Sequence, residues 1–214
     1  MAKPIGILGG TFDPVHHGHL RLAIEIRQSC ALDEVRLVPL HTPPHRSSPG
    51  TSQYHRLQML NLAVEGMTGL VIDERELQRA GVSFTADTLN SMRKEAGPQP
   101  LCLIMGMDAF QKLNTWHKWR SLIDLAHIII ARRPGANTEI KNSEIAEFYN
   151  TNLTKDLSDL HTKKSGCIFY TDIAELDISS TKIRELVSTK QDTRYLLPEN
   201  VISYIEKEDL YHRY

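Results

Sequence analysis

Six short apolar runs, separated by segments of helical periodicity, restrict most strongly the fold that this chain can adopt. The clearest of them are continuous rather than alternating in hydropathy, which is typical of strands buried on both faces. Their alternation with helices predicts an α/β fold, a Rossmann-like doubly wound and mostly parallel sheet. The runs lie at residues 4–8, 35–40, 70–73, 101–106, 127–132 and 168–173.

Helical periodicity fills much of the sequence between these runs. Leu57, Leu60, Val64 and Met67 repeat at three and four residues, and shorter repeats occur at 88–92 and 122–125. Residues 134–166 are polar and weakly periodic, and we expect a peripheral helical or loop excursion there. After Thr181 the chain is expected to be helical to its end, broken by Pro198. We therefore expect one domain over 1–214, with the sheet and its helices to about 176 and a small C-terminal helical part from about 177.

Length, net charge and cysteine spacing exclude several classes of protein. The chain has 214 residues and a net charge of −1, so its bulk electrostatics predict neither a nucleic-acid nor a membrane partner. Cys30, Cys102 and Cys167 are too widely spaced for a metal pattern or an obvious disulfide framework. No apolar run approaches a membrane span, and the first residues lack the features of a signal peptide. These observations predict a cytoplasmic protein, while the oligomeric state stays open.

A glycine-rich turn with three histidines, GGTFDPVHHGH (residues 9–19), follows the first predicted strand. In open α/β sheets, ligands bind at the carboxyl ends of the strands. Gly9 and Gly10 allow a tight turn and let a ligand approach bare backbone. The turn matches neither the dinucleotide fingerprint nor the P-loop.

The histidines of this turn favour an anion. If a helix begins near Gly18, His16 and His19 lie at its N-terminus, where free N–H groups and the helix dipole attract negative charge. The spacing therefore predicts a phosphate chain. The alternatives are a purely structural turn and a metal site, for which Asp13 is the nearest third ligand.

A second anion motif, DISSTKIREL (residues 177–186), follows the last predicted strand. The hydroxyls of Ser179, Ser180 and Thr181 stand where a helix should begin, so they either cap that helix or bind an anion. Arg184 lies one turn after Thr181, on the same face. Alone, this motif is weak. Together with the glycine-rich turn it predicts a two-sided grip on a triphosphate.

The two motifs together resemble the nucleotidylyltransferase superfamily that carries the HxGH motif, and most closely its bacterial nicotinate-nucleotide adenylyltransferases. The likeness continues in order over nearly the whole chain, through HTPPHR (41–46), SFTADTL (83–89), GMDAF (106–110), TWHKW (115–119) and RYLLPENVISYIEKEDLY (194–211). The resemblance implies a Rossmann-like fold and transfer of AMP from ATP to nicotinate mononucleotide. The products would be deamido-NAD and pyrophosphate, in NAD biosynthesis, with Mg²⁺ accompanying the ATP.

The resemblance also implies roles for individual residues. His16, His19 and Arg184 would be catalytic, with His19 nearest the reacting centre. Arg46 stands where the family commonly has Lys, which keeps the charge but changes its geometry. No protein ligand is assigned to Mg²⁺, which phosphates and water often hold. ATP would contact Gly9, Gly10, Thr11, Phe12, His16, His19, Gly106, Asp108, Ile178, Ser180, Thr181 and Arg184, and nicotinate mononucleotide His45, Arg46, Thr85, Trp116 and His117.

The acceptor residues carry open alternatives. Trp116 is a platform for a pyridine ring or an ordinary core aromatic, and the backbone N–H groups of Trp116 and His117 are expected at a helix start that binds a carboxylate. Thr85 contacts that carboxylate or caps the following helix. Asp108 suits ribose hydroxyls at a strand end or caps a helix near Ala109. Asp13 is expected to cap the glycine-rich turn, and His17 has no assigned role.

Other functions fit less well. Phosphopantetheine adenylyltransferases share the turn, but they typically have Thr-Asn-Gly-His and lack the PPH and TWHKW segments. A nicotinamide mononucleotide acceptor differs by one charge and stays open. A nucleotide-sensing module without catalysis would have lost His19 or Arg184, and a Rossmann oxidoreductase would need the dinucleotide fingerprint.

Overall fold

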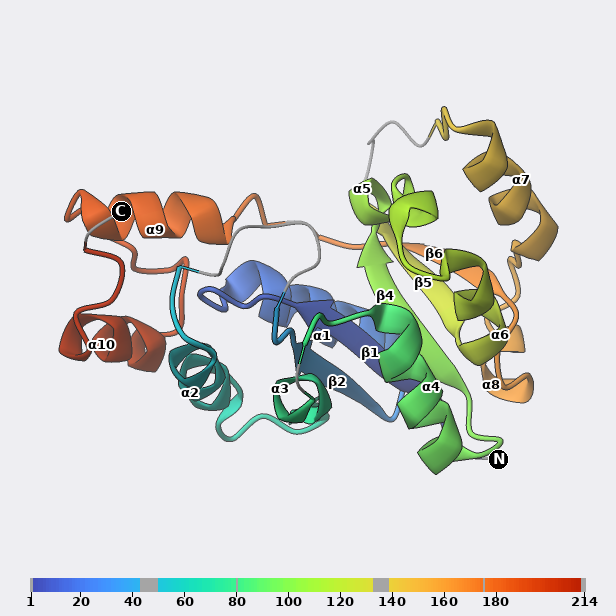
Figure 1. Cartoon of the computed structure of the whole chain (residues 1–214), viewed down its shortest axis with the longest axis horizontal. Coiled ribbons are helices and arrows are strands. Elements are labelled where there is room, and N and C mark those ends of the chain that lie inside the picture. The colour runs from blue at the N-terminus through green and yellow to red at the C-terminus, as the bar shows by residue number, and fades with distance from the viewer. Residues whose placement is uncertain (1, 43–49, 80, 133–138, 175, 213–214) are drawn as a thin grey trace.

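A six-stranded sheet forms the centre of the molecule (Figure 1). The computed structural model describes residues 2–42, 50–79, 81–132, 139–174 and 176–212. Every strand pairs in parallel with its neighbours, in the order β3-β2-β1-β4-β5-β6. The doubly wound α/β fold predicted from the apolar runs is therefore confirmed. The strands are β1 (Ile5–Gly10), β2 (Glu34–Pro39), β3 (Leu70–Ile72), β4 (Leu101–Gly106), β5 (His127–Arg132) and β6 (Ile168–Asp172).

Both faces of the sheet are buried, which explains the continuous apolar runs. Along β4, Cys102 and Ile104 belong to one hydrophobic cluster, whereas Leu103 and Met105 belong to the other. The first cluster includes residues of α1 (His17–Ser29), α2 (Gln53–Val64), α8 (Asp159–Thr162), α9 (Ser180–Ser188) and α10 (Glu199–Lys207). The second includes residues of α4 (Thr85–Ala96), α5 (Met107–Phe110), α6 (Leu122–Leu125) and α7 (Ser143–Asn152).

The remaining short elements lie between these. They are α3 (Arg75–Gln78) and the 3₁₀ helices η1 (Leu113–Thr115) and η2 (Trp119–Ser121). Within the part of the chain that is described, no helix combines the length and hydropathy that crossing a bilayer requires. The three cysteines are free thiols, and all are buried.

The C-terminal part differs from the expected helix broken at Pro198. Helix α9 ends at Ser188, and Pro198 is the N-cap of α10 rather than an interruption. Proline has no N–H to donate, so it suits a position that precedes a helix better than one inside it. Figure 1 shows α9 and α10 at one end of the molecule near α2, with α6, α7 and α8 at the other. Ile183 and Val201 share a hydrophobic cluster with Leu8 of the sheet, which supports our proposal of a single domain.

The strand order determines where a ligand can bind. The chain runs from β1 outward to β2 and β3, then returns to the other side of β1 for β4, β5 and β6. The connections beyond the carboxyl ends of β1 and β4 therefore diverge and leave a crevice between them. Gly10 and Gly106 end these two strands, so the glycine-rich turn lies directly at this switch point.

Candidate active site

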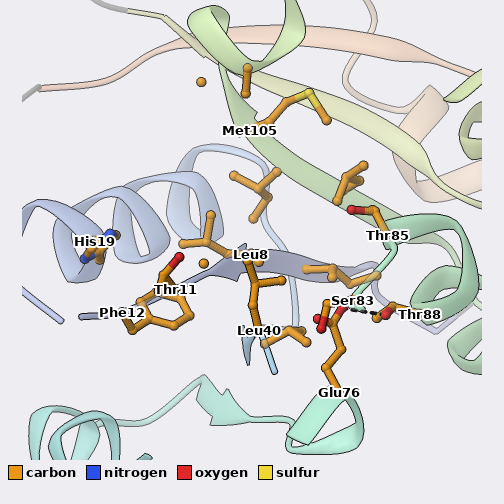
Figure 2. Close-up of a pocket in the computed structure, with 18 of the residues that line it drawn as sticks. Leu8, Thr11, Phe12, His19, Leu40, Glu76, Ser83, Thr85, Thr88 and Met105 are labelled. Carbon is orange, nitrogen blue, oxygen red and sulfur yellow. Dashed lines mark hydrogen bonds between the residues drawn. The ribbon is translucent and has the colours of Figure 1, made fainter. Parts of the chain in front are cut away.

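A cavity of about 1100 Å³ lies at the carboxyl ends of the central strands (Figure 2). One part is lined by the turn residues Gly9–Phe12, by His19 and by Ser180, Thr181 and Arg184 of α9; we call it the phosphate end. Another part is lined by Thr85, Trp116 and His117; we call it the acceptor end. Figure 2 shows His19 and Phe12 on one side of the cavity and Thr85, Thr88 and Glu76 on the other.

The glycine-rich turn is tightly built. Phe12 has a φ of 50°, in the left-handed region that a non-glycine residue rarely adopts, and its side chain is buried. A Cβ at Gly10 would lie 2.9 Å from the Phe12 ring, so only glycine fits there. A Cβ at Gly9 would meet nothing within 4 Å. The open space over Gly9 leaves room for the ligand that we expect to lie against this backbone.

The two histidines of the HxGH motif stack on each other. Helix α1 begins at His17 with His16 as its N-cap, one residue earlier than expected. The His16 and His19 rings are 3.7 Å apart between centroids and inclined by 25°. A Cβ at Gly18 would lie 3.0 Å from the His16 ring, so the glycine between the histidines leaves room for the stack.

Burial keeps both imidazoles neutral. Desolvation, and then the nearby His17, lower the pKa of His16 from 6.5 to about 4. Desolvation and then His16 hold the pKa of His19 well below its usual value. Among the described residues, neither Nδ1 atom has a hydrogen-bond partner. An anion in the cavity beside His19 would favour the protonated form of that imidazole and so oppose the effect of burial on its pKa.

The second motif is docked directly on the first. Ser179 caps α9 by accepting a hydrogen bond from the Lys182 N–H, which resolves the choice left open between cap and ligand for that hydroxyl. The Ser180 hydroxyl donates to the Pro14 carbonyl (2.9 Å), so its proton is not available to an anion. The backbone N–H groups of Ser180 and Thr181, at the start of the helix, remain available.

Arg184 makes a further contact between the motifs. Its Nη1 donates to the Asp13 carbonyl oxygen (2.7 Å), and its Nη2 donates to the Thr181 hydroxyl oxygen (3.4 Å). A guanidinium has five N–H donors in a rigid plane, so Arg184 can hold the turn and still face the cavity. The predicted two-sided arrangement of the motifs is therefore present.

Asp13 has a different role from the expected turn cap. Its side chain is buried, and its carboxylate accepts hydrogen bonds from the Gly50 N–H (2.6 Å) and the Tyr211 hydroxyl (2.7 Å). Both donors come from segments far from the turn in the sequence. The carboxylate thus connects the turn to other parts of the fold, and a cap predicted from neighbouring residues was wrong.

The acceptor end is formed by the ends of short elements. Trp116 follows η1, and its N–H donates to the Leu113 carbonyl (2.9 Å), so the expected pair of free amides at a helix start is wrong. Within the described residues, no acceptor takes the His117 N–H, which leaves one amide for a carboxylate. Thr85 is the first residue of α4 and does not cap it, because the N-cap is Phe84.

Several predicted residues lie apart from the cavity lining. Asp108 is exposed in the first turn of α5, whose N-cap is Gly106, so the alternative that Asp108 caps this helix was wrong, while its expected ribose contact stays a prediction. Gly106 lines the cavity, whereas Asp108, Ile178 and His16 are not among the described lining residues. His45 and Arg46 lie outside the described residues.

Two buried charged residues near the cavity were not identified by the sequence analysis. Arg56 of α2 is 1% exposed, and its guanidinium donates to the carbonyls of Thr11 and Leu40 at 2.7 Å each, behind the glycine-rich turn. Glu76 of α3 lines the cavity and accepts a hydrogen bond from the Thr88 hydroxyl (2.5 Å). Arg56 precedes Leu60 by four residues, so its place on the buried face of α2 is the signal that would have revealed it.

The described part of the protein contains no set of side chains that could hold a resident metal ion. No three His, Cys, Asp or Glu side chains converge there. A divalent cation that arrives with a nucleotide would take most of its ligands from phosphate oxygens and water, as Mg²⁺ commonly does.

The doubly wound sheet brings the HxGH turn and the start of α9 together at its switch point, which is the arrangement that the resemblance to nucleotidylyltransferases implies. Residues 7–186 match the family model described as Cytidylyltransferase-like. A protein of Aeromonas hydrophila named "Probable nicotinate-nucleotide adenylyltransferase" is 47% identical over 99% of this chain and 98% of its own length. A protein of the same name from Methylococcus capsulatus is 43% identical over 97% of this chain and 99% of its own.

This chain belongs to the nicotinate-nucleotide adenylyltransferase family. The fold agrees with that membership. The solved structure of Plasmodium falciparum nicotinic acid mononucleotide adenylyltransferase complexed with NaAD superimposes with a TM-score of 0.74 at 19% identity, and 98% of each chain is covered.

Proposed function

We propose that this protein transfers AMP from ATP to nicotinate mononucleotide in NAD biosynthesis. The observation that carries the proposal is the docking of α9 on the glycine-rich turn, which aligns Ser180, Thr181 and Arg184 with His19 around one cavity. The names of its relatives support the substrate pair.

The reaction balances without a protein nucleophile. A phosphate oxygen of the mononucleotide attacks the α-phosphorus of ATP, and the bond from that phosphorus to the bridging oxygen of the pyrophosphate breaks. Deamido-NAD and pyrophosphate leave, and the electron pair of the broken bond stays on the pyrophosphate oxygen. The protein therefore needs to align two phosphates and stabilise the charge that develops on the leaving group.

The phosphate end provides these functions. His19 lines the cavity and presents an imidazole nitrogen in a desolvated site, where a hydrogen bond to a developing negative charge is stronger than in water. His16 stacks on the His19 ring and would hold it in place. Arg184 and the amides at the start of α9 would hold the β- and γ-phosphates. Mg²⁺, which would arrive with the triphosphate, would supply further charge neutralisation.

The acceptor end would orient nicotinate mononucleotide. Trp116 is half-buried and lines the cavity, so its ring can stack on the pyridine. The His117 N–H and the Thr85 hydroxyl are the proposed partners of the nicotinate carboxylate. Asp108 remains the proposed partner of a ribose, and Arg46 of the mononucleotide phosphate. The buried free thiols fit the cytoplasmic setting that we propose.

The test is direct. The protein is mixed with ATP, Mg²⁺ and either nicotinate or nicotinamide mononucleotide, and pyrophosphate release is followed. We expect release with both ATP and nicotinate mononucleotide present, and a lower kcat/KM with nicotinamide mononucleotide. No release with either acceptor would contradict the proposed activity. Equal kcat/KM for the two acceptors would contradict only the selectivity for the carboxylate.

A further inference from the structure

The far C-terminus of the chain reaches the glycine-rich turn. Tyr211 is buried, and its hydroxyl donates to Asp13 Oδ1 at 2.7 Å across 198 residues of sequence. Tyr211 follows α10, which lies at the same end of the molecule as α9, the helix that carries Arg184 (Figure 1). The proposed reaction assigns no role to either Asp13 or Tyr211.

The Asp13 carboxylate needs hydrogen-bond donors, because the residue is only 3% exposed. A buried carboxylate is costly unless hydrogen bonds and charge satisfy it. Gly50 provides one donor and Tyr211 another, and the Arg184 Nη1 lies 4.0 Å from Asp13 Oδ2. Burial and the adjacent Asp13 raise the pKa of Tyr211, so its hydroxyl keeps its proton and remains a donor.

The Tyr211 hydrogen bond is one of several that hold the C-terminal part against the turn. Ser180 donates to Pro14, Arg184 donates to the Asp13 carbonyl, and the His17 N–H donates to the Leu196 carbonyl (3.0 Å). The first two involve residues that would face the triphosphate. Asp13 is the point where the turn, Arg184 and the C-terminus meet.

We propose that Tyr211 is a positioning residue of the phosphate site, whose hydroxyl, through Asp13, fixes the glycine-rich turn and Arg184 in the geometry that ATP requires. The segment that follows α10 thereby completes the active site. Without the hydroxyl, the Asp13 carboxylate loses a hydrogen-bond donor. Its interaction with Arg184 then strengthens, and this stronger interaction draws the guanidinium away from the cavity. This inference rests on the proposed function, because ATP is the ligand whose kinetics report it.

The test compares two tyrosine variants of the full-length protein. Tyr211→Phe removes the hydroxyl and keeps the ring. Tyr204→Phe is the matched control, because its hydroxyl bonds to His55 Nδ1 (2.8 Å) between α10 and α2. We expect Tyr211→Phe to lower kcat/KM for ATP by about 10-fold, as for a lost hydrogen bond to a charged group, with the KM for nicotinate mononucleotide unchanged. Tyr204→Phe should keep wild-type kinetics at a temperature where both variants are folded.

A second variant keeps the inference testable if Tyr211→Phe does not fold. Asp13→Asn retains the Tyr211 ring and hydroxyl but replaces one acceptor oxygen with an N–H₂ donor, so either Gly50 or Tyr211 loses its acceptor and the turn is no longer fixed. It should therefore produce the same selective loss toward ATP. In a double-variant cycle, Tyr211→Phe should then add little to Asp13→Asn. Wild-type kinetics in Tyr211→Phe, equal losses in the two tyrosine variants, or equal losses toward ATP and the mononucleotide would overturn the inference. An inactive wild-type protein would instead contradict the proposed function.

Discussion

The phosphate end and the acceptor end of the cavity are held in different ways. At the phosphate end, Arg56, Arg184 and Ser180 each donate to a backbone carbonyl of the glycine-rich turn, and Arg56 also donates to the carbonyl of Leu40, just after β2. His16 is buried there, and His19 is half-buried against it. At the acceptor end, Trp116 is half-buried and His117 is exposed, and both follow a single 3₁₀ turn. A preorganised, dry end suits transition-state stabilisation, whereas a more exposed end suits binding and selectivity. Changes at the two ends should therefore affect different kinetic constants.

The largest effect is expected at His19. His19→Ala should lower kcat by about 100- to 1000-fold, the range for losing one preorganised donor to a developing charge, and should change the KM for ATP much less. Steady-state pyrophosphate release measures both constants. His17→Ala is the matched control, since we assign the His17 side chain no contact with either substrate. If the two variants lose the same activity, His19 has no special place in the reaction.

The buried histidine pair also predicts pH-dependent stability. The pKa of His16 is about 4 in the folded protein and 6.5 in an unfolded chain, so between these pH values only the unfolded chain binds the proton. The free energy of unfolding should therefore fall as the pH falls through this window, by about 3 kcal/mol from His16. Chemical denaturation at a series of pH values measures this. His16→Gln should show a shallower dependence, and an identical dependence would show that His16 does not contribute.

A smaller loss is expected at Arg184. Arg184→Lys retains the charge but has one point donor group, which cannot hold the Asp13 carbonyl and a phosphate in the same planar geometry. We expect kcat/KM for ATP to fall by about 10- to 100-fold, the equivalent of a hydrogen bond to a charged group. Arg194→Lys is the control, because Arg194 is exposed and pairs with Asp192. Equal kinetics in Arg184→Lys and wild type would mean that only the charge matters.

The smallest expected effect is at the acceptor end. Trp116→Ala should raise the KM for nicotinate mononucleotide by about 10-fold, in the range measured for stacking of a base on an aromatic ring, with kcat little changed. Trp119→Phe, in the same TWHKW segment, is the control. Trp119 is buried against Phe148, so its change should lower the melting temperature without a selective rise in that KM. A fall in kcat as large as that of His19→Ala would erase the distinction between the two ends.

Much of the fold was predictable from the sequence, for a local reason. The apolar runs at 101–106 and 127–132 coincide with β4 and β5 because strands buried on both faces need unbroken apolar sequence. The start of α1 was displaced by one residue, because His16 adopts extended backbone as N-cap while its ring stacks on His19. The bounds of α9 and α10 were less predictable, because amphipathic periodicity does not show where a proline begins rather than interrupts a helix.

The candidate site was predictable only where one segment contains the whole signal. The glycine-rich turn and the start of α9 were both recognised, since each has its glycines, histidines or hydroxyls within a dozen residues. The amide of Trp116 was assigned wrongly, because its acceptor, Leu113, depends on a 3₁₀ turn without a sequence signature. Arg56 and Glu76 were not found, because a buried charge looks like a surface charge until its partners are known.

The sequence by itself determined the sheet, the order of its elements and the two motifs that would meet at its switch point. Those features depend on local hydropathy, on backbone freedom at glycine and on residue spacing. Only the tertiary structure decided that Ser180 donates to Pro14, that the imidazoles are neutral and that Asp13 is satisfied by Tyr211. Such facts depend on which groups lose water together, and the residues that share a buried space are brought together by the fold from distant parts of the chain.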